Sequence, residues 1–287
     1  MLNILTDLTT HRNTVKPCHI FHSPKGLLVR LVRNVAISKQ LCINHPKKGL
    51  HVTDTLFQLP AIPVVPVLNE NAGYPVGRIF CVGRNYAAHA AEMGVEVDRE
   101  APFYFTKSPA NMVLSGAQVP YPQGTDNFHY EMELALAIGA PLFQATAEQA
   151  RAAIYGFGCA LDMTRRDLQI RERKKQRPWS LGKDVENGTV LAPLTRASDW
   201  APSPERRIHL AVNGETRQDA TLAELIWSLE EILCHLSHFY HLRPGDIILT
   251  GTPAGVGPVV PGDVIEGGID GLQPISMGID AVGRQVE

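Results

Sequence analysis

The sequence predicts an α+β protein in which β-strands predominate and short helices lie between them. Residues Tyr130–Ile138 alternate strictly between large apolar residues and small or acidic ones, and this period of two is the signature of a strand. Apolar runs predict further strands at residues 78–83, 103–107 and 156–162. In the C-terminal third, Pro-Gly-Asp turns at residues 244–246 and 261–263 each introduce another strand.

The composition indicates a globular protein. The chain has 287 residues, of which 44% are hydrophobic, enough to bury a full core. A formal net charge of -2 argues against nucleic-acid binding, and no apolar run approaches the roughly 18 residues of a membrane span. The 5 cysteines form no C-x-x-C pair, so neither a zinc knuckle nor a disulfide framework is indicated, and a reducing cytoplasm is favoured.

The N-terminal residues differ in kind from the rest. Up to Leu50 there are 8 lysines and arginines and a single acid, Asp7, whereas the remainder has 19 basic and 28 acidic residues. This part shows no sustained period and is interrupted by prolines. We therefore expect residues 1–55 to be a basic, poorly ordered extension and residues 56–287 to be the folded domain. A transit peptide is less favoured, because the segment lacks the Arg and Ser richness of one.

The first strand, at residues 78–83, leads through the turn Arg84-Asn85-Tyr86 into a short Ala-rich helix, Ala87–Met93, which Gly94 ends. His89 and Glu92 are three residues apart and share a face of that helix. Glu92 can therefore raise the basicity of the imidazole and fix its tautomer, as a general base requires. The alternative is ordinary surface decoration, because His-x-x-Glu is common.

The alternating strand carries two carboxylates on one face. Glu131 and Glu133 share that face with Ala135 and Ala137, and the opposite face is large and apolar. Adjacent anions repel strongly in a poorly solvated site, and the alanines leave room beside them. This pattern predicts a divalent metal; an edge strand with a solvated glutamate pair is the alternative.

The next elements bring one acid and several cations. A Thr-x-x-Gln capping box at Thr146 predicts a helix to about Tyr155, and the strand at 156–162 ends in Asp162. A second helix is expected over Thr164–Lys175, with Thr164 as its cap and most of its basic residues in solvent. Lys183 then follows a small apolar turn.

The C-terminal part contributes a helix and a glycine-rich turn. A capping box at Ser228 predicts an amphipathic helix to about His241, whose histidines at a spacing of three we interpret as surface or core residues rather than metal ligands. The turn Thr250–Gly257 lacks the Gly-Lys-Ser/Thr of a phosphate-binding loop. Its backbone N–H groups can still hold a small anion such as a carboxylate.

Together these motifs resemble the fumarylacetoacetate hydrolase family over the chain from about Arg78 to its end. The resemblance is carried by Gly83-Arg84-Asn85-Tyr86 with His89 and Glu92, Glu131-Met132-Glu133-Leu134, Leu161-Asp162-Met163-Thr164, Trp179-Ser180-Leu181-Gly182-Lys183 and Thr250–Gly257. Within the family, residues Ile79–His89 are most similar to the members that act on fumarylpyruvate in bacterial gentisate degradation.

The resemblance implies a role for each matched residue. The metal ligands fall on Glu131, Glu133 and Asp162, an all-oxygen set that suits Mg²⁺ or Mn²⁺ rather than zinc. A catalytic lid dyad falls on His89 and Glu92, and the active-site lysine is Lys183. Substrate contacts fall on Arg84, Arg166, Gln169 and Thr252.

The resemblance also implies a fold and a reaction. The expected fold is a mixed β-sheet rolled into a barrel-like core with peripheral helices, in a homodimer. The expected reaction is metal-dependent hydrolysis of a C–C bond in a small 2,4-dioxo acid, with fumarylpyruvate giving fumarate and pyruvate. The alternatives are another acylpyruvate hydrolase, an oxaloacetate decarboxylase or isomerase, and a metal-binding module without turnover.

Overall fold

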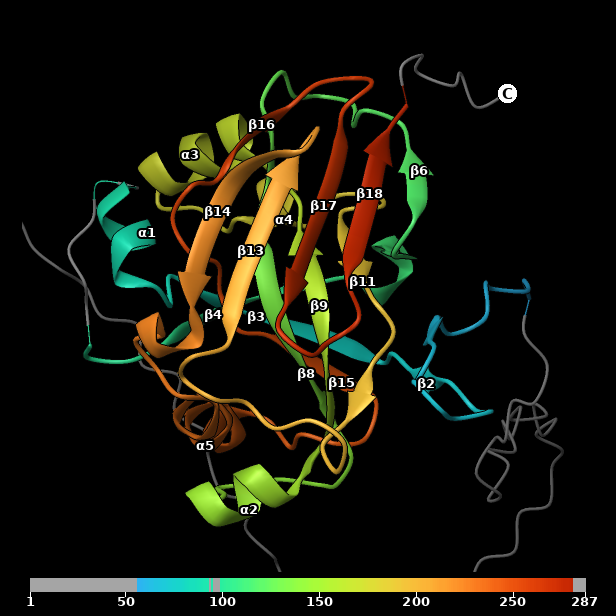
Figure 1. The fold of residues 1–287 in the computed structure, drawn as a ribbon, viewed down its shortest axis with the longest axis vertical. Coiled ribbons are helices and arrows are strands. Elements are labelled where there is room, and N and C mark those ends of the chain that lie inside the picture. The colour runs from blue at the N-terminus through green and yellow to red at the C-terminus, as the bar shows by residue number, and fades with distance from the viewer. Residues whose placement is uncertain (1–55, 93, 95–98, 281–287) are drawn as a thin grey trace, which may run out of the picture. The chain divides into compact units, whose positions relative to one another are not determined.

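The computed structural model describes residues 56–280, except for residues 93 and 95–98 (Figure 1). The predicted N-terminal extension, residues 1–55, lies outside the described residues, as does Met93 of the predicted Ala-rich helix. None of the helices in the described part is long and apolar enough to cross a membrane.

The elements alternate along the chain much as the sequence predicts. The strands are β1 (Val64–Val65), β2 (Tyr74–Pro75), β3 (Arg78–Gly83), β4 (Phe103–Lys107), β5 (Met112–Leu114), β6 (Ala117–Val119), β7 (Phe128–Tyr130), β8 (Met132–Ile138), β9 (Ile154–Asp162), β10 (Thr164–Arg165), β11 (Thr189–Leu191), β12 (Thr195–Arg196), β13 (Arg207–Val212), β14 (Glu215–Thr221), β15 (Asp246–Leu249), β16 (Gly257–Val259), β17 (Val264–Ile269) and β18 (Ile275–Ile279). The helices are α1 (Ala87–Glu92), α2 (Ala147–Ala152), α3 (Arg166–Lys174), α4 (Ser180–Lys183) and α5 (Leu229–Phe239), with 3₁₀ turns at Pro109–Asn111 and Leu222–Glu224.

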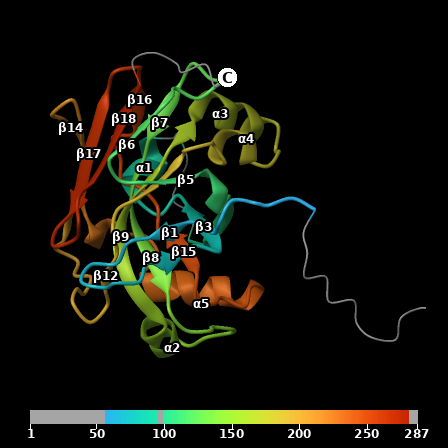
Figure 2. The same ribbon diagram turned by 90° about the vertical axis from the view of Figure 1, so that its right-hand side faces the viewer.

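Two large mixed sheets enclose the main core. The 8-stranded sheet has the order β4-β3-β15-β8-β9-β11-β5, with β12 beside β9, and the 5-stranded sheet has the order β14-β13-β17-β18-β6. Figure 2 shows the second sheet lying across the central strands β8 and β9, with α3 and α4 at one end and α2 and α5 at the other. Most strand pairs are antiparallel, and β15–β3, β11–β5 and β18–β6 are parallel. The expectation of a mixed, barrel-like sheet with peripheral helices is confirmed.

Strand β8 is buried on both faces. Its large residues, such as Leu134 and Leu136, belong to the main core, while Ala135 and Ala137 pack in a second apolar cluster. The strand lies between β15 and β9, so the alternative of an edge strand with a solvated glutamate pair is wrong. The space expected beside the alanines is filled by apolar side chains of the second cluster.

The predicted strand Tyr130–Ile138 is divided at Glu131. Tyr130 ends β7, which pairs with β10 and β16 in a small sheet, and Met132 begins β8 in the large one. Glu131 therefore lies where the chain passes from one sheet to the other.

Both capping boxes, at Thr146 and Ser228, are present as predicted.

Three predicted helix boundaries are wrong by two or three residues. The predicted helix from Thr164 begins instead at Arg166, because Thr164 and Arg165 pair with β7. The Thr164 hydroxyl donates to the backbone oxygen of Asp162 at 3.1 Å rather than capping the helix. The helices expected to reach Tyr155 and His241 end earlier, where the chain extends again.

We predict that deletion of residues 1–55 leaves the melting temperature and the turnover of a 2,4-dioxo acid nearly unchanged. The reason is that both large sheets and their buried core are built from residue 64 onward. Calorimetry and a turnover assay on the full-length and shortened chains would test this. A large loss of either property would show that the segment supports the domain or an oligomer contact.

Candidate metal centre and active site

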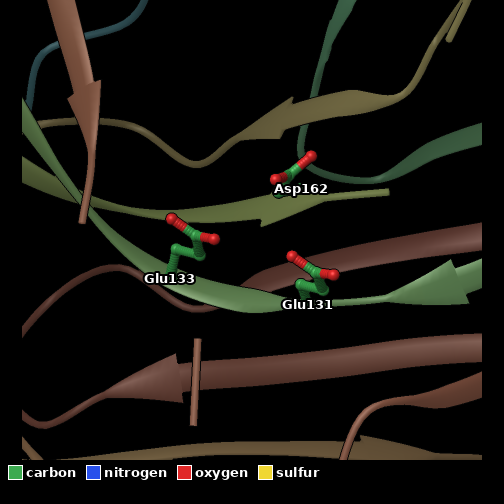
Figure 3. A group of neighbouring side chains, drawn as sticks. All are labelled: Glu131, Glu133 and Asp162. Atoms are coloured by element: carbon green, nitrogen blue, oxygen red, sulfur yellow. The ribbon is translucent and has the colours of Figure 1, made fainter. Parts of the chain in front are cut away.

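Three carboxylates converge at the junction of β7, β8 and β9. Glu133 lies on β8, Glu131 immediately precedes it, and Asp162 ends β9, whose antiparallel register with β8 brings its end to Glu131. The Asp162 N–H donates to the Glu131 backbone oxygen at 2.9 Å. One carboxylate oxygen from each residue lies within 4.8 Å of the others, and Figure 3 shows the three side chains grouped around one space. All three residues are buried.

Buried cations balance two of these carboxylates. Lys183 Nζ donates to Glu131 Oε2 at 2.6 Å and to Asp162 Oδ2 at 2.7 Å. Arg166 donates to the other oxygen of Glu131, and Lys107 Nζ donates to Asp162 Oδ1 at 2.7 Å. Burial alone would raise the pKa of Glu131, but Lys183 and Arg166 outweigh it and hold that pKa below its ordinary value.

Glu133 is the carboxylate that the protein balances least. Its Oε2 accepts the Gly251 N–H at 2.7 Å, and no cation of the described residues lies within ion-pair distance of it. Burial, Asp162 and Glu131 together raise its pKa well above the ordinary value. A divalent cation between the carboxylates would remove this repulsion, and three carboxylates form the oxygen donor set of Mg²⁺ or Mn²⁺. The triad is therefore suited to a divalent metal.

The predicted dyad is formed on the short helix α1. His89 Nδ1 hydrogen-bonds to Glu92 Oε2 at 3.2 Å, and both Glu92 oxygens accept the Gly255 N–H at 3.2 Å. Burial lowers the pKa of His89, although Glu131 and Glu92 oppose that shift. The net shift favours the neutral imidazole, which is the form that accepts a proton.

The turn Thr250–Gly257, which the sequence predicts to be able to hold a small anion, donates two of its backbone N–H groups to carboxylates. The carboxylates are the protein's own: Gly251 donates to Glu133 and Gly255 donates to Glu92. Gly251 has φ +98, and an added Cβ would lie 2.7 Å from that of Asn85. This turn therefore fixes one member of the metal triad and one member of the dyad.

One cavity brings most of the predicted residues together. It is lined by Val82, Gly83, Arg84, His89, Phe105, Glu131, Glu133, Arg166, Gln169, Arg173, Trp179, Lys183 and Thr252. Asp162 is fully buried beside Glu131, and Glu92 is hydrogen-bonded to His89. The cavity is partly open to solvent, and about 380 Å³ of it, counted with the adjoining solvent, is not filled by atoms.

Neighbouring groups fix the predicted substrate contacts. Arg166 Nη1 donates to Gln169 Oε1 at 2.9 Å, and Thr252 Oγ1 accepts the Gln218 amide at 2.8 Å. Arg84, at φ 61, has its guanidinium carbon 5.2 Å from the centre of the Phe103 ring. These contacts orient the side chains before any ligand binds.

Sequence reasoning missed three residues of this site. Lys107 was assigned only to a strand, yet it donates to Asp162 and to the backbone oxygen of Lys183. Gln218 accepts the Met132 N–H at 3.0 Å, between the two glutamates, and nothing in its polar surroundings signals this role. The sequence gives Arg173 no role of its own among the basic residues of its helix, but its spacing of seven from Arg166 places both on one helix face.

Comparisons with known proteins identify the family of this chain. Residues 78–279 match the family described as fumarylacetoacetate (FAA) hydrolase C-terminal. A fumarylpyruvate hydrolase of a Ralstonia species is 51% identical over 187 residues, which are 64% of this chain and 97% of that protein. An oxaloacetate tautomerase of Escherichia coli is 40% identical over 199 residues, 69% of this chain and 90% of that one.

A solved structure extends the similarity to the fold. The crystal structure of fumarylpyruvate hydrolase from Pseudomonas aeruginosa, in complex with Mn²⁺ and pyruvate, has a TM-score of 0.77 and 42% sequence identity. The match covers 80% of this chain and 100% of that one. With the family match spanning most of its length, the chain belongs to the fumarylacetoacetate hydrolase family.

Proposed function

We propose that this protein is a metal-dependent hydrolase that cleaves the C–C bond of fumarylpyruvate to give fumarate and pyruvate. The observation that carries the proposal is a single cavity lined both by Glu131 and Glu133 of the carboxylate triad and by the imidazole of His89, with Asp162 buried beside Glu131. Its support from relatives is the 51% identity to a fumarylpyruvate hydrolase and the similarity to a structure with Mn²⁺ and pyruvate.

In this proposal Glu131, Glu133 and Asp162 hold Mg²⁺ or Mn²⁺. The bound ion would supply electrophilic stabilisation of the negative charge that develops on the 2-oxo acid part of the substrate. Lys183 lies at the same end of the cavity, where its charge also favours the carboxylate of that part. Arg84, Arg166, Gln169 and Thr252 are the proposed substrate contacts.

His89 is the proposed base. Its neutral imidazole takes a proton from a water molecule, and that water attacks the carbonyl carbon C4 of the 2,4-dioxo acid. The C3–C4 bond then breaks, its electron pair leaves with C3 as the enolate of pyruvate, and C3 takes up a proton. Glu92 holds the imidazole through Nδ1, which leaves Nε2 for the water.

A second function keeps the same metal centre and omits the water. Oxaloacetate tautomerisation or decarboxylation requires enolate stabilisation alone, and an oxaloacetate tautomerase is 40% identical to this chain. A third possibility is the same hydrolysis with a different acyl group on the pyruvate. The last alternative is a metal-binding module without turnover. Hydrolysis is favoured because His89 of the dyad lines the same cavity as Glu131 and Glu133 of the triad.

The deciding experiment is a comparison of substrates. Purified full-length protein with Mg²⁺ or Mn²⁺ would be incubated with fumarylpyruvate, acetylpyruvate and oxaloacetate, and loss of the enol chromophore and release of pyruvate would be followed. We expect fumarylpyruvate to be cleaved fastest. Turnover of oxaloacetate alone would replace the proposal by the second function, and no turnover of any substrate would favour the binding module.

The pH dependence provides a further test. His89 must be neutral to act as a base, and its pKa lies below the ordinary value of 6.5 because of burial. The midpoint of the acid limb of the pH–rate profile should therefore lie below pH 6.5. Glu92 raises the pKa of His89, so Glu92→Gln should move this decline to still lower pH. A shift to higher pH in profiles of kcat/KM would contradict the assignment.

We also expect the protein to be a cytoplasmic homodimer with a small-molecule substrate and no nucleic-acid or membrane partner. Light scattering on the purified full-length chain tests the dimer.

A further inference from the structure

Helix α3 presents a row of three polar side chains to the cavity. Arg166, Gln169 and Arg173 are spaced by three and four residues, so they share one face of the helix, and all three line the cavity. Arg166 and Gln169 are buried, whereas Arg173 is half-buried. The row therefore runs from the metal triad outward to the rim.

The cations near the metal triad, which are Arg166 and two lysines outside the row, already have partners. Arg166 and Lys183 pair with Glu131, and Lys107 pairs with Asp162. Their charges balance the carboxylates of the triad, so they are not available to bind a second carboxylate at the far end of the substrate.

Arg173 differs from its neighbours on the helix. Among the described residues, none forms a hydrogen bond or ion pair with its side chain, whereas the exposed Arg171, which does not line the cavity, pairs with the buried Glu172 at 2.7 Å. An arginine at the wall of a cavity, with its charge uncommitted, is suited to binding a carboxylate with two parallel hydrogen bonds.

The distance between Arg166 and Arg173 along the helix is similar to the length of a seven-carbon diacid. Arg166 and Arg173 are seven residues apart, which corresponds to about 10 Å along the axis. An extended seven-carbon 2,4-dioxo diacid separates its two carboxylates by about 8 Å, given C–C bonds of roughly 1.5 Å. The four-carbon oxaloacetate is too short to reach both ends, and acetylpyruvate has no second carboxylate.

We infer that Arg173 binds the terminal carboxylate of the acyl group and so selects dicarboxylic acylpyruvates. The inference rests on the proposed function, because that function places the 2-oxo acid end at the metal triad. Arg173 then contributes to specificity and takes no part in the bond cleavage.

A pair of ligands that cannot be cleaved tests this directly. 2-Oxoheptanedioate and 2-oxoheptanoate have the same length and the same 2-oxo acid end, and differ only in the terminal carboxylate. In calorimetry on the full-length protein with Mg²⁺, we expect the diacid to bind at least about 20-fold more tightly, the size expected for a charged hydrogen-bond partner. Arg173→Met should remove this difference and leave the affinity for 2-oxoheptanoate unchanged.

Arg171→Met is the matched control, because it removes the same charge from the same helix outside the cavity. It should keep the preference for the diacid. The inference is overturned if Arg173→Met weakens both ligands equally, which indicates a structural role, or if the unaltered protein does not distinguish them.

Kinetics provide the second measurement. Arg173→Met should lower kcat/KM for fumarylpyruvate by at least about 20-fold, mostly through KM, and leave acetylpyruvate within about threefold. Arg173→Lys should restore part of the loss. Equal losses on both substrates overturn the inference. If the unaltered protein cleaves neither substrate, the proposed function fails. The calorimetric comparison of 2-oxoheptanedioate with 2-oxoheptanoate then still decides the role of Arg173.

Discussion

Glu131→Gln is expected to lower turnover by about 10³-fold at millimolar Mg²⁺, the scale of losing electrostatic stabilisation of a transition state. The substitution keeps the shape of the side chain and removes one of three carboxylates that lie within 4.8 Å of one another. Two carboxylates hold a hard divalent cation much less well than three. Calorimetric titration with Mn²⁺ should show a matching loss of metal affinity.

Glu131 also has a structural role that this variant disturbs. It pairs with Arg166 and Lys183, and removing one partner of a buried ion pair can cost about 3–5 kcal/mol of stability. Some loss of melting temperature in Glu131→Gln is therefore expected and would not by itself argue against metal binding.

Glu133→Gln separates the two effects. Glu133 is repelled by Asp162 and Glu131, and its bond to the Gly251 N–H can be accepted equally by a glutamine oxygen. We expect this variant to melt at the same temperature as the unaltered protein, or higher, while losing metal affinity and turnover. Glu230→Gln, which removes a surface partner of Arg151, is the control and should change neither. Near-normal turnover and metal affinity in both triad variants would show that the metal site is wrongly assigned.

His89→Ala is expected to lower hydrolysis of 2,4-dioxo acids by at least about 100-fold, because loss of a general base typically costs about 10²–10⁴-fold. A group that only activates water acts in the hydrolytic transition state and contributes little to ligand chelation. Oxalate, which resembles the 2-oxo acid end, should therefore bind with nearly unchanged affinity. Any decarboxylation of oxaloacetate should survive better than hydrolysis, since it needs no activated water.

Glu92→Gln should show the same pattern with a smaller loss. The oxygen of the introduced amide can still accept the Gly255 N–H, so this contact is kept while the negative charge beside His89 is removed. His238→Ala, an exposed histidine that does not line the cavity, is the matched control. Undiminished hydrolysis in His89→Ala would remove the dyad from the mechanism, whereas a collapse of oxalate binding would make His89 a binding residue.

Local patterns predicted the elements well because each depends on backbone geometry over a few residues. The alternation in Tyr130–Ile138 identified the buried strand β8, and the capping boxes at Thr146 and Ser228 identified the starts of α2 and α5. Helix ends were less predictable. Thr164 looks like a cap in sequence, but pairing with β7 takes it into a strand instead.

The candidate site likewise has features that local sequence predicts and features that only the tertiary fold decides. Local periodicity was enough to predict that the side chains of the two glutamates lie together, although Glu131 lies between two strands, and to bring His89 and Glu92 together on one turn of helix. The side chains that balance the triad's charge and hold its backbone in place depend instead on the tertiary fold. Lys107 reaches Asp162 from 55 residues away, and Gln218 reaches Met132 from 86. Such contacts are set by the order and register of strands in the sheets, which no local period encodes.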